Sequence, residues 1–170
     1  MRHSNSSPQS ATEPLCLVLC EITIIFKYPL IIFVFKMATI PEPCETRKKA
    51  LVGLHYAPIK PFIGRALKRF GYEVDIVSSP DDMIDKTTGT EYDFYLMEAN
   101  LGTPGGTDIT PSLTIYKLVE ERVKSRKAKF LAVSGNYQTV DIAKRNGIPA
   151  RPSGDVFMNL FDSLSKILSD

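Results

Sequence analysis

Apolar and polar residues follow two alternating patterns along most of the chain. From residue 49 onward, short apolar runs typical of buried strands are followed by stretches whose apolar residues recur at helical spacing. The pattern predicts strands at 50–54, 72–77, 92–97, 129–134 and 148–150, and helices at 59–70, 80–88, 110–125 and 139–147. A last predicted helix has an apolar face that runs from Val156 to Leu168. Five strand–helix units in strict alternation predict a doubly wound α/β fold, with a parallel five-stranded sheet and helices on both faces.

Residues that favour helix ends stand at the expected places. Gly71 follows one predicted helix and Gly147 closes another, and glycine is favoured there because it adopts the left-handed backbone that ends many helices. Ser78 or Ser79 is available as the N-cap of the helix at 80–88.

The first 46 residues differ from the rest and form an N-terminal extension in front of a domain at 47–170. Residues 15–36 make an apolar run long enough to span a bilayer, but a glutamate, a lysine and a proline interrupt it. The cost of inserting the two charges nearly cancels the gain from the apolar residues. Three interpretations stay open: a membrane anchor, an unstructured or docked tail, or an extension upstream of a true start at Met37. A proline-containing linker leads from this run to the domain.

Composition narrows the class of protein only slightly. The chain is 44% hydrophobic and 24% charged, as is usual for a globular protein, and its net charge of +2 gives no strong attraction to nucleic acid. Its 3 cysteines, Cys16, Cys20 and Cys44, lie in the first quarter of the chain without metal-ligand partners. This pattern predicts a reducing, cytoplasmic location without a disulfide framework.

Residues with chemical potential gather where the predicted strands end. Sites in parallel sheets lie outside the carboxyl ends of the strands, so the loops after four strands meet at one edge. Those loops carry His55, Tyr56, Glu98, Asn100, Ser134, Arg151 and Pro152. The sequence therefore predicts a pocket with one carboxylate, one hydroxyl and one guanidinium, in which Glu98 meets Arg151 directly or through water.

Several segments of residues 47–170 resemble the receiver domain of two-component response regulators. The resemblance rests on "RFGYEVDIVSSPDDM", "YDFYLMEANLGTPGG", "FLAVSGN" and "GIPARPSG". It implies a flavodoxin-like (βα)5 sheet with strand order 2-1-3-4-5. It also implies that Glu98 stands at the phosphoacceptor aspartate and Ser134 at the hydroxyl that contacts the phosphoryl group. Arg151 and Pro152 would take the place of the family's lysine and proline.

The departures from the receiver pattern indicate an atypical pseudo-receiver. The first strand ends in His55 and Tyr56 instead of the two acids with which receivers hold magnesium. Glu98 is one methylene longer than aspartate, and Ile148 stands where receivers carry an aromatic switch residue. These changes argue against acyl-phosphate chemistry, so we expect no catalytic residue, no metal and no cofactor. Glu98 is interpreted either as an imitation of the phosphorylated state or as a relic balanced by Arg151.

The resemblance predicts a signalling module, not an enzyme. Its partner would be an unidentified signalling protein, such as a histidine kinase, a phosphotransfer protein or an output protein. The partner face implied by the family includes Ile142, Arg145 and Ile148. No nucleic-acid partner is expected, and a membrane is expected only if residues 15–36 are an anchor. Two alternatives stay open: a small-ligand or cofactor domain on a flavodoxin-like fold, and a receiver with residual phosphorylation.

Overall fold

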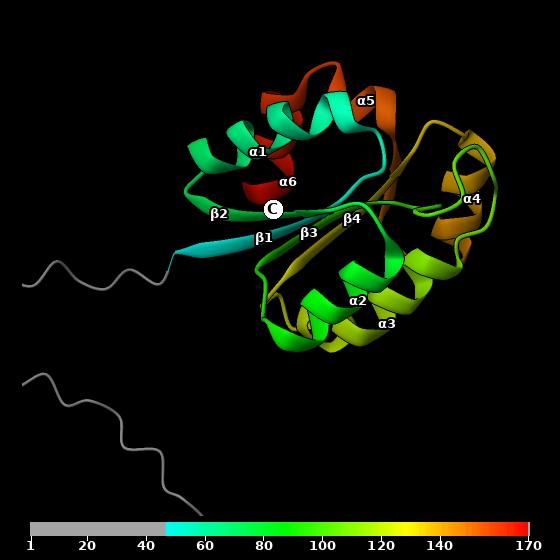
Figure 1. Cartoon of the computed structure of the whole chain (residues 1–170), viewed down its shortest axis with the longest axis horizontal. Coiled ribbons are helices and arrows are strands. Elements are labelled where there is room, and N and C mark those ends of the chain that lie inside the picture. Colours follow the sequence, from blue (N-terminus) through cyan, green and yellow to red (C-terminus); the bar gives the residue numbers. More distant parts are fainter. Residues whose placement is uncertain (1–46, 170) are drawn as a thin grey trace, which may run out of the picture. The chain divides into compact units, whose positions relative to one another are not determined.

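The computed structural model describes residues 47–169, which form a three-layer α/β domain (Figure 1). The strands are β1 (Lys48–Gly53), β2 (Tyr72–Val77), β3 (Phe94–Glu98), β4 (Lys129–Ser134) and β5 (Ala150–Pro152). The helices are η1 (Ala57–Ile59), α1 (Lys60–Arg69), α2 (Pro80–Gly89), α3 (Thr110–Lys124), α4 (Tyr137–Arg145), α5 (Ser153–Phe157) and α6 (Leu160–Ser169). The expectations for the N-terminal extension lie outside the described residues. Among the helices described, none is both long and apolar enough to cross a bilayer.

The five strands form one parallel sheet in the order β2-β1-β3-β4-β5, which confirms the predicted fold class and strand order. Strand β3 is central: Leu96 is in register with Val52 of β1 on one side and with Leu131 of β4 on the other. A parallel sheet of this kind is covered on both faces, so its inner strands are continuous apolar runs.

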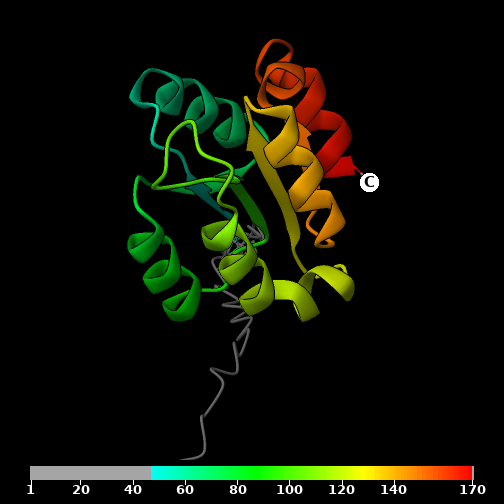
Figure 2. The ribbon, with the colours of Figure 1, turned by 90° about the vertical axis from the view of Figure 1, so that its right-hand side faces the viewer.

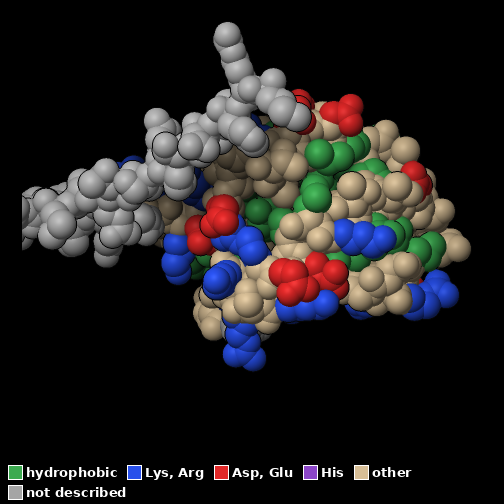
Figure 3. Space-filling model, turned by 90° about the horizontal axis from the view of Figure 1, so that it is seen from below, with side chains coloured by type: hydrophobic (Ala, Val, Ile, Leu, Met, Phe, Trp, Pro, Cys, Tyr) green, Lys and Arg blue, Asp and Glu red, His purple; other side chains and the backbone are tan. Residues whose placement is uncertain are grey.

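Two hydrophobic cores lie on opposite faces of the sheet. Along β3, Phe94 and Leu96 enter one core while Tyr95 and Met97 enter the other, as the two-residue period of a strand requires. Helices α1, α5 and α6 cover the first face, and α2, α3 and α4 cover the second (Figure 1). On the α2–α3 side of the molecule, Lys and Arg side chains are interspersed with Asp and Glu side chains (Figure 3).

The helix ends follow the predicted chemistry. The Ser79 side chain caps α2 by accepting a hydrogen bond from the Asp82 backbone N–H at 3.1 Å. Asn136 caps α4 in the same way, accepting from the Gln138 N–H at 2.9 Å. Gly71 and Gly147, which follow α1 and α4, have φ values of +84° and +77°, a region that disfavours other residues.

Two predicted elements near the C-terminus are placed wrongly. The fifth strand spans residues 150–152 and not 148–150, because the Ile148 N–H donates to the Ala143 carbonyl and so completes the end of α4. The single predicted last helix is two helices, α5 and α6, separated by a turn at Met158 and Asn159. Neither turn residue is glycine or proline, so the sequence offers no signal for the break.

The close packing at Gly53 gives a first prediction. A Cβ atom on this residue would lie 2.9 Å from Met83 Sδ and 3.0 Å from Leu101 Cδ2, both closer than van der Waals contact. We expect Gly53→Ala to lower the free energy of unfolding by about 1–3 kcal/mol because the core must shift to admit the methyl group. Urea unfolding measures the change. The matched control is Gly89→Ala, where a Cβ meets open space. A Gly53→Ala protein as stable as wild type would contradict the packing described here.

The Asp75–Tyr92 hydrogen bond predicts a pH dependence of stability. The buried Tyr92 hydroxyl donates to Asp75 Oδ2 at 2.6 Å, and Lys86 lies 3.3 Å from the same oxygen. The Tyr92 hydrogen bond, assisted by Lys86, holds the pKa of Asp75 below its usual value. Because the folded pKa is depressed, the stabilisation is present above the unfolded pKa of about 3.9 and is lost as pH falls through the folded pKa.

Tyr92→Phe should therefore be less stable than wild type at neutral pH, and the gap should narrow below about pH 4. Urea unfolding at a series of pH values tests this. Tyr95→Phe is the control: the Tyr95 hydroxyl accepts from the Tyr92 N–H at 3.4 Å and bonds to no carboxylate within residues 47–169. A gap that stays constant down to pH 2 would mean that the hydroxyl does not act through Asp75.

Candidate functional site

A cavity of about 430 Å³ opens at the carboxyl ends of the strands. Figure 2 views the molecule from the side on which the loops after these strands lie. The cavity is lined by His55, Tyr56, Ile59, Glu98, Asn100, Gly105, Val133, Ser134, Gly135, Asn136, Ser153 and Phe157. Five of the seven predicted pocket residues are thus brought together: His55, Tyr56, Glu98, Asn100 and Ser134.

Glu98 is the only carboxylate in this lining, and its neighbour is His55. The Glu98 Oε2 atom accepts a hydrogen bond from the His55 backbone N–H at 3.1 Å. The same oxygen contacts Nδ1 of the His55 ring. The Glu98 side chain is 14% exposed and that of His55 is 38% exposed, so the pair lies at the mouth of the cavity. The contact follows from the register of β1 and β3. Gly53, the last residue of β1, is opposite Met97, so the loop after β1 passes beside Glu98, the last residue of β3.

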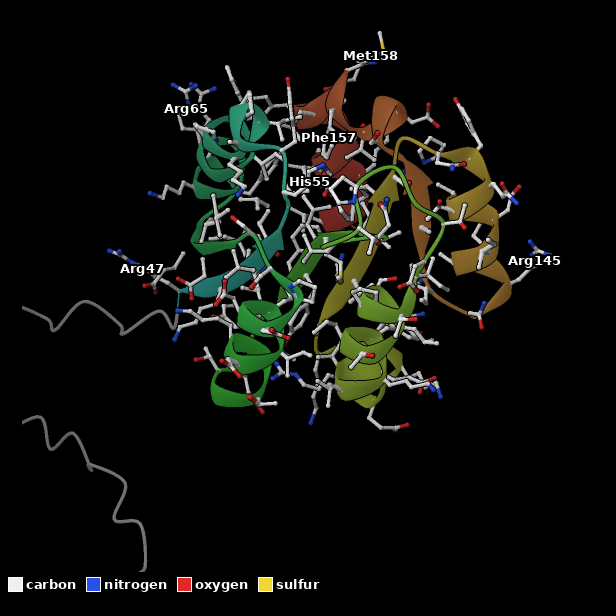
Figure 4. The ribbon with its side chains drawn as sticks, turned by 45° about the vertical axis from the view of Figure 1, so that its right-hand side comes forward. Arg47, His55, Arg65, Arg145, Phe157 and Met158 are labelled. Atoms are coloured by element: carbon white, nitrogen blue, oxygen red, sulfur yellow. The ribbon has the colours of Figure 1, made fainter. Side chains whose placement is uncertain are left out.

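The Glu98 carboxylate fixes the position of the imidazole ring. The Oε2 atom meets both the backbone N–H and the ring Nδ1 of His55, so the carboxylate and the imidazole ring orient each other. In Figure 4 His55 lies at the end of β1, above the carboxyl edge of the sheet and near Phe157. The arrangement is a carboxylate–histidine pair, not a free acid facing solvent.

The predicted contact between Glu98 and Arg151 is absent as a direct ion pair within the described residues. Glu98 is in register with Val133 of β4, and Val133 is in register with Arg151 of β5. The two residues are therefore two strands apart, roughly 9–10 Å at the usual strand spacing. The prediction treated their strands as neighbours, and β4 lies between them. Arg151 is exposed and lines a different cavity, beside Lys144 and Ile167, and Pro152 is also absent from the lining around Glu98.

The polar residues around Glu98 already have backbone partners. The buried Ser134 hydroxyl accepts from the Asn136 N–H at 3.1 Å and so shapes the loop after β4. The Asn100 side chain donates to the carbonyls of Thr103 at 3.0 Å and Gly106 at 3.1 Å, which fastens the glycine-rich loop after β3. These contacts show a structural role for both residues in this conformation.

Two residues of α5, Ser153 and Phe157, line the cavity although the sequence did not single them out. They follow directly on β5, so the helix begins at the edge of the sheet and its first and last residues reach the cavity. Pro152 directly precedes α5, but the pattern that predicts the last helix does not reveal that its first and last residues in α5 reach the cavity.

The predicted partner face is only partly a surface. Ile148 is 1% exposed and packs in the core, so it cannot contact a partner, and Ile142 is half-buried against the same core. Arg145 is exposed and points away from the domain at the outer end of α4 (Figure 4). The Ile148 side chain is buried because it packs in the core cluster that contains Val140 and Ala143 of α4.

The site offers few ligands for a metal ion. No group of three or more His, Cys, Asp or Glu side chains gathers anywhere within residues 47–169. At the cavity, Glu98 and His55 bond to each other, and the remaining polar atoms are amides and hydroxyls. Magnesium prefers several oxygen ligands with at least one or two carboxylates, so this donor set fits it poorly.

Comparisons with known proteins identify the fold. No family model and no curated protein matches the chain. A response regulator from Burkholderia pseudomallei, solved with a phosphorylated aspartic acid, calcium ion and citrate, is 18% identical with a TM-score of 0.56, over 71% of this chain and 66% of that one.

Two further solved structures give the same picture. A CheY-like response regulator receiver domain from Methylobacillus flagellatus is 21% identical with a TM-score of 0.55, over 72% of this chain and 97% of that one. A two-component response regulator from Clostridium difficile is 16% identical with a TM-score of 0.56, over the same shares, 72% and 97%. The domain therefore has the fold of a response-regulator receiver domain, and identities this low establish the fold alone.

A double-mutant cycle distinguishes the partner observed for Glu98 from the partner predicted. We expect Glu98→Ala to lower the free energy of unfolding by about 1 kcal/mol, since the pair with His55 is partly exposed to water. Glu98→Gln should lose less because it keeps an acceptor oxygen. Urea unfolding of single and double variants should give a coupling energy between Glu98 and His55 and one near zero between Glu98 and Arg151. Coupling to Arg151 as large as that to His55 would overturn this assignment.

Proposed function

We propose that this domain is an atypical receiver-fold signalling module that binds a partner protein without a phosphorylation cycle. The observation that carries the proposal is the bond between Glu98 and His55 at the place where receivers have a free phosphoacceptor. Because one fold hosts many functions, we infer the function from this site and not from the fold.

Phosphoryl transfer to Glu98 would face two obstacles. One carboxylate oxygen, Oε2, already accepts from the His55 backbone and contacts its ring, which fixes the orientation of the whole carboxylate. Small misplacements of reacting atoms cost large factors in rate. The loop after β1 also supplies no carboxylate with which to hold a magnesium ion over the phosphoryl oxygens. Glu98 instead keeps a negative charge at the edge of the sheet without modification.

Such a module would act by recognition. A ligand or modification can shift a conformational equilibrium only through its different affinity for two states. With the carboxylate held by His55, and with buried Ile148 in place of an aromatic switch residue, little in this pocket would respond to a phosphodonor. The partner proposed is a histidine kinase, a phosphotransfer protein or an output protein of a cytoplasmic two-component pathway.

Incubation with acetyl phosphate and magnesium, followed by mass spectrometry of the intact chain, tests the proposal. We expect no phosphoryl adduct on wild type and none on Glu98→Asp, because restoring the shorter acid does not restore the metal ligands. A conventional receiver domain treated in parallel is the positive control. Calorimetric titration should show no saturable magnesium site in the millimolar range.

An adduct on Glu98 of the wild-type chain would show that phosphorylation persists and would sink the proposal. An adduct on Glu98→Asp alone would mean that the length of the acid, and not the missing metal site, is the obstacle. A saturable magnesium site at the loops after β1 and β3 would contradict the reading of the donor set given above.

A further inference from the structure

A second hollow, which the proposed function does not use, lies beside the first on the α1–α6 side of the domain. It has a volume of about 710 Å³. It is lined by Tyr56, Pro58, Ile59, Phe62, Arg65, Arg69, Phe157, Met158, Leu160 and Phe161. We call this surface the α1–α6 groove. Its walls come from η1 and α1 on one side and from α5, α6 and the turn between them on the other.

Large apolar side chains around the α1–α6 groove are exposed to water. Met158 is 86% exposed, Phe62 and Tyr56 are each 58% exposed, and Phe161 is 44% exposed. Single exposed apolar residues are common, but four large ones around one hollow mark an interaction site. Met158 projects outward from the turn between α5 and α6 (Figure 4), and methionine adapts its shape to different partners.

The only charges in the lining of the groove are positive. Arg65 lies over the Phe62 ring at 5.0 Å, and Arg69 lies over the Phe161 ring at 5.2 Å. These cation–π contacts hold both guanidinium groups against the apolar wall while their N–H donors remain available. Within residues 47–169 neither arginine forms an ion pair. Helix α1, "KPFIGRALKR", has basic residues and no acidic one, so nothing along it cancels the positive rim.

We propose that the α1–α6 groove binds an amphipathic α-helix of a partner protein, with large apolar side chains on one face and Glu or Asp residues beside them. The apolar face would fill the hollow between α1 and α5–α6, as helices do in hydrophobic grooves. The acidic side chains would meet Arg65 and Arg69, whose planar groups bind carboxylates in a bidentate manner. This charge complementarity selects an acidic helix over a neutral or basic one.

The full-length chain and synthetic helical peptides test the proposal. The probe peptide has Leu at positions i, i+3, i+4 and i+7 with Glu on both flanks; a second peptide replaces every Glu by Lys, and a third scrambles the first. We expect the Glu peptide to bind saturably at micromolar concentrations and the Lys and scrambled peptides to bind at least tenfold more weakly, measured by fluorescence anisotropy. Raising the salt concentration should weaken binding of the Glu peptide because the contacts with the rim are exposed.

Variants locate the binding surface. Phe62→Ala and Met158→Ala should each weaken binding of the Glu peptide at least fivefold, and both remove exposed side chains, so the fold should remain intact by circular dichroism. The matched control is Leu118→Ala, which removes a 51% exposed side chain from α3 and should leave the affinity unchanged. The double variant Arg65→Glu/Arg69→Glu should reverse the preference and favour the Lys peptide.

Several results would overturn the proposal. These are no saturable binding of the Glu peptide, equal affinity for the Glu and Lys peptides, or an affinity unaffected by Phe62→Ala and Met158→Ala. Binding to phosphatidylserine vesicles that Phe62→Ala abolishes, without peptide binding, would assign the surface to a membrane. A concentration-dependent dimer lost in Phe62→Ala, again without peptide binding, would assign it to a second copy of the chain. None of these results depends on whether Glu98 is phosphorylated.

Discussion

Strand β3 must bury side chains on both faces, and most of the domain is arranged around that requirement. Residues from Phe94 to Met97 are at most 1% exposed, so β3 needs a neighbouring strand on each side and a helical layer above and below. Apolar burial is the main favourable term in folding, which makes any edge position for this strand costly. Its carboxyl end, and with it Glu98, therefore lies in the middle of the sheet edge.

The central place of β3 also decides which groups can reach Glu98. The loops after β1 and β4 flank it, while β5 is one strand too far away. An acid in this position is within reach of the loop after β1, which here brings His55 to it. The backbone N–H of His55 donates to the carboxylate, and the ring Nδ1 contacts the same oxygen. The lining of this cavity thus has one carboxylate, and that carboxylate is paired with a histidine.

Local patterns in the sequence carried enough information for the fold but not for all of the site. The strands at 72–77 and 129–134 lie where the alternation of apolar residues placed them, and the parallel order follows from the strand–helix alternation. The short fifth strand was placed two residues too early and the turn at Met158 was missed, because three-residue strands and turns without glycine or proline have no distinctive pattern.

The site shows the same division between local and long-range information. Grouping His55, Glu98 and Ser134 required only that strands of one parallel sheet end at the same edge. Choosing the partner of Glu98 required the distance between strands. Arg151 was chosen because it lies at a strand end, but the register places it two strands away from Glu98. The prediction for Ile148 failed for a similar reason. Ile148 was expected on the partner face, but it is buried, and its backbone N–H bonds to the end of α4, which no side-chain pattern reveals.

Tyr56, Ile59 and Phe157 line both the cavity at Glu98 and the α1–α6 groove. The two hollows therefore share these three side chains as a common wall. A substitution in that wall that improves the fit of one occupant also reshapes the space open to the other. The two surfaces cannot diversify independently in evolution, and a lineage that changes its partner at one of them must adjust the chemistry of both.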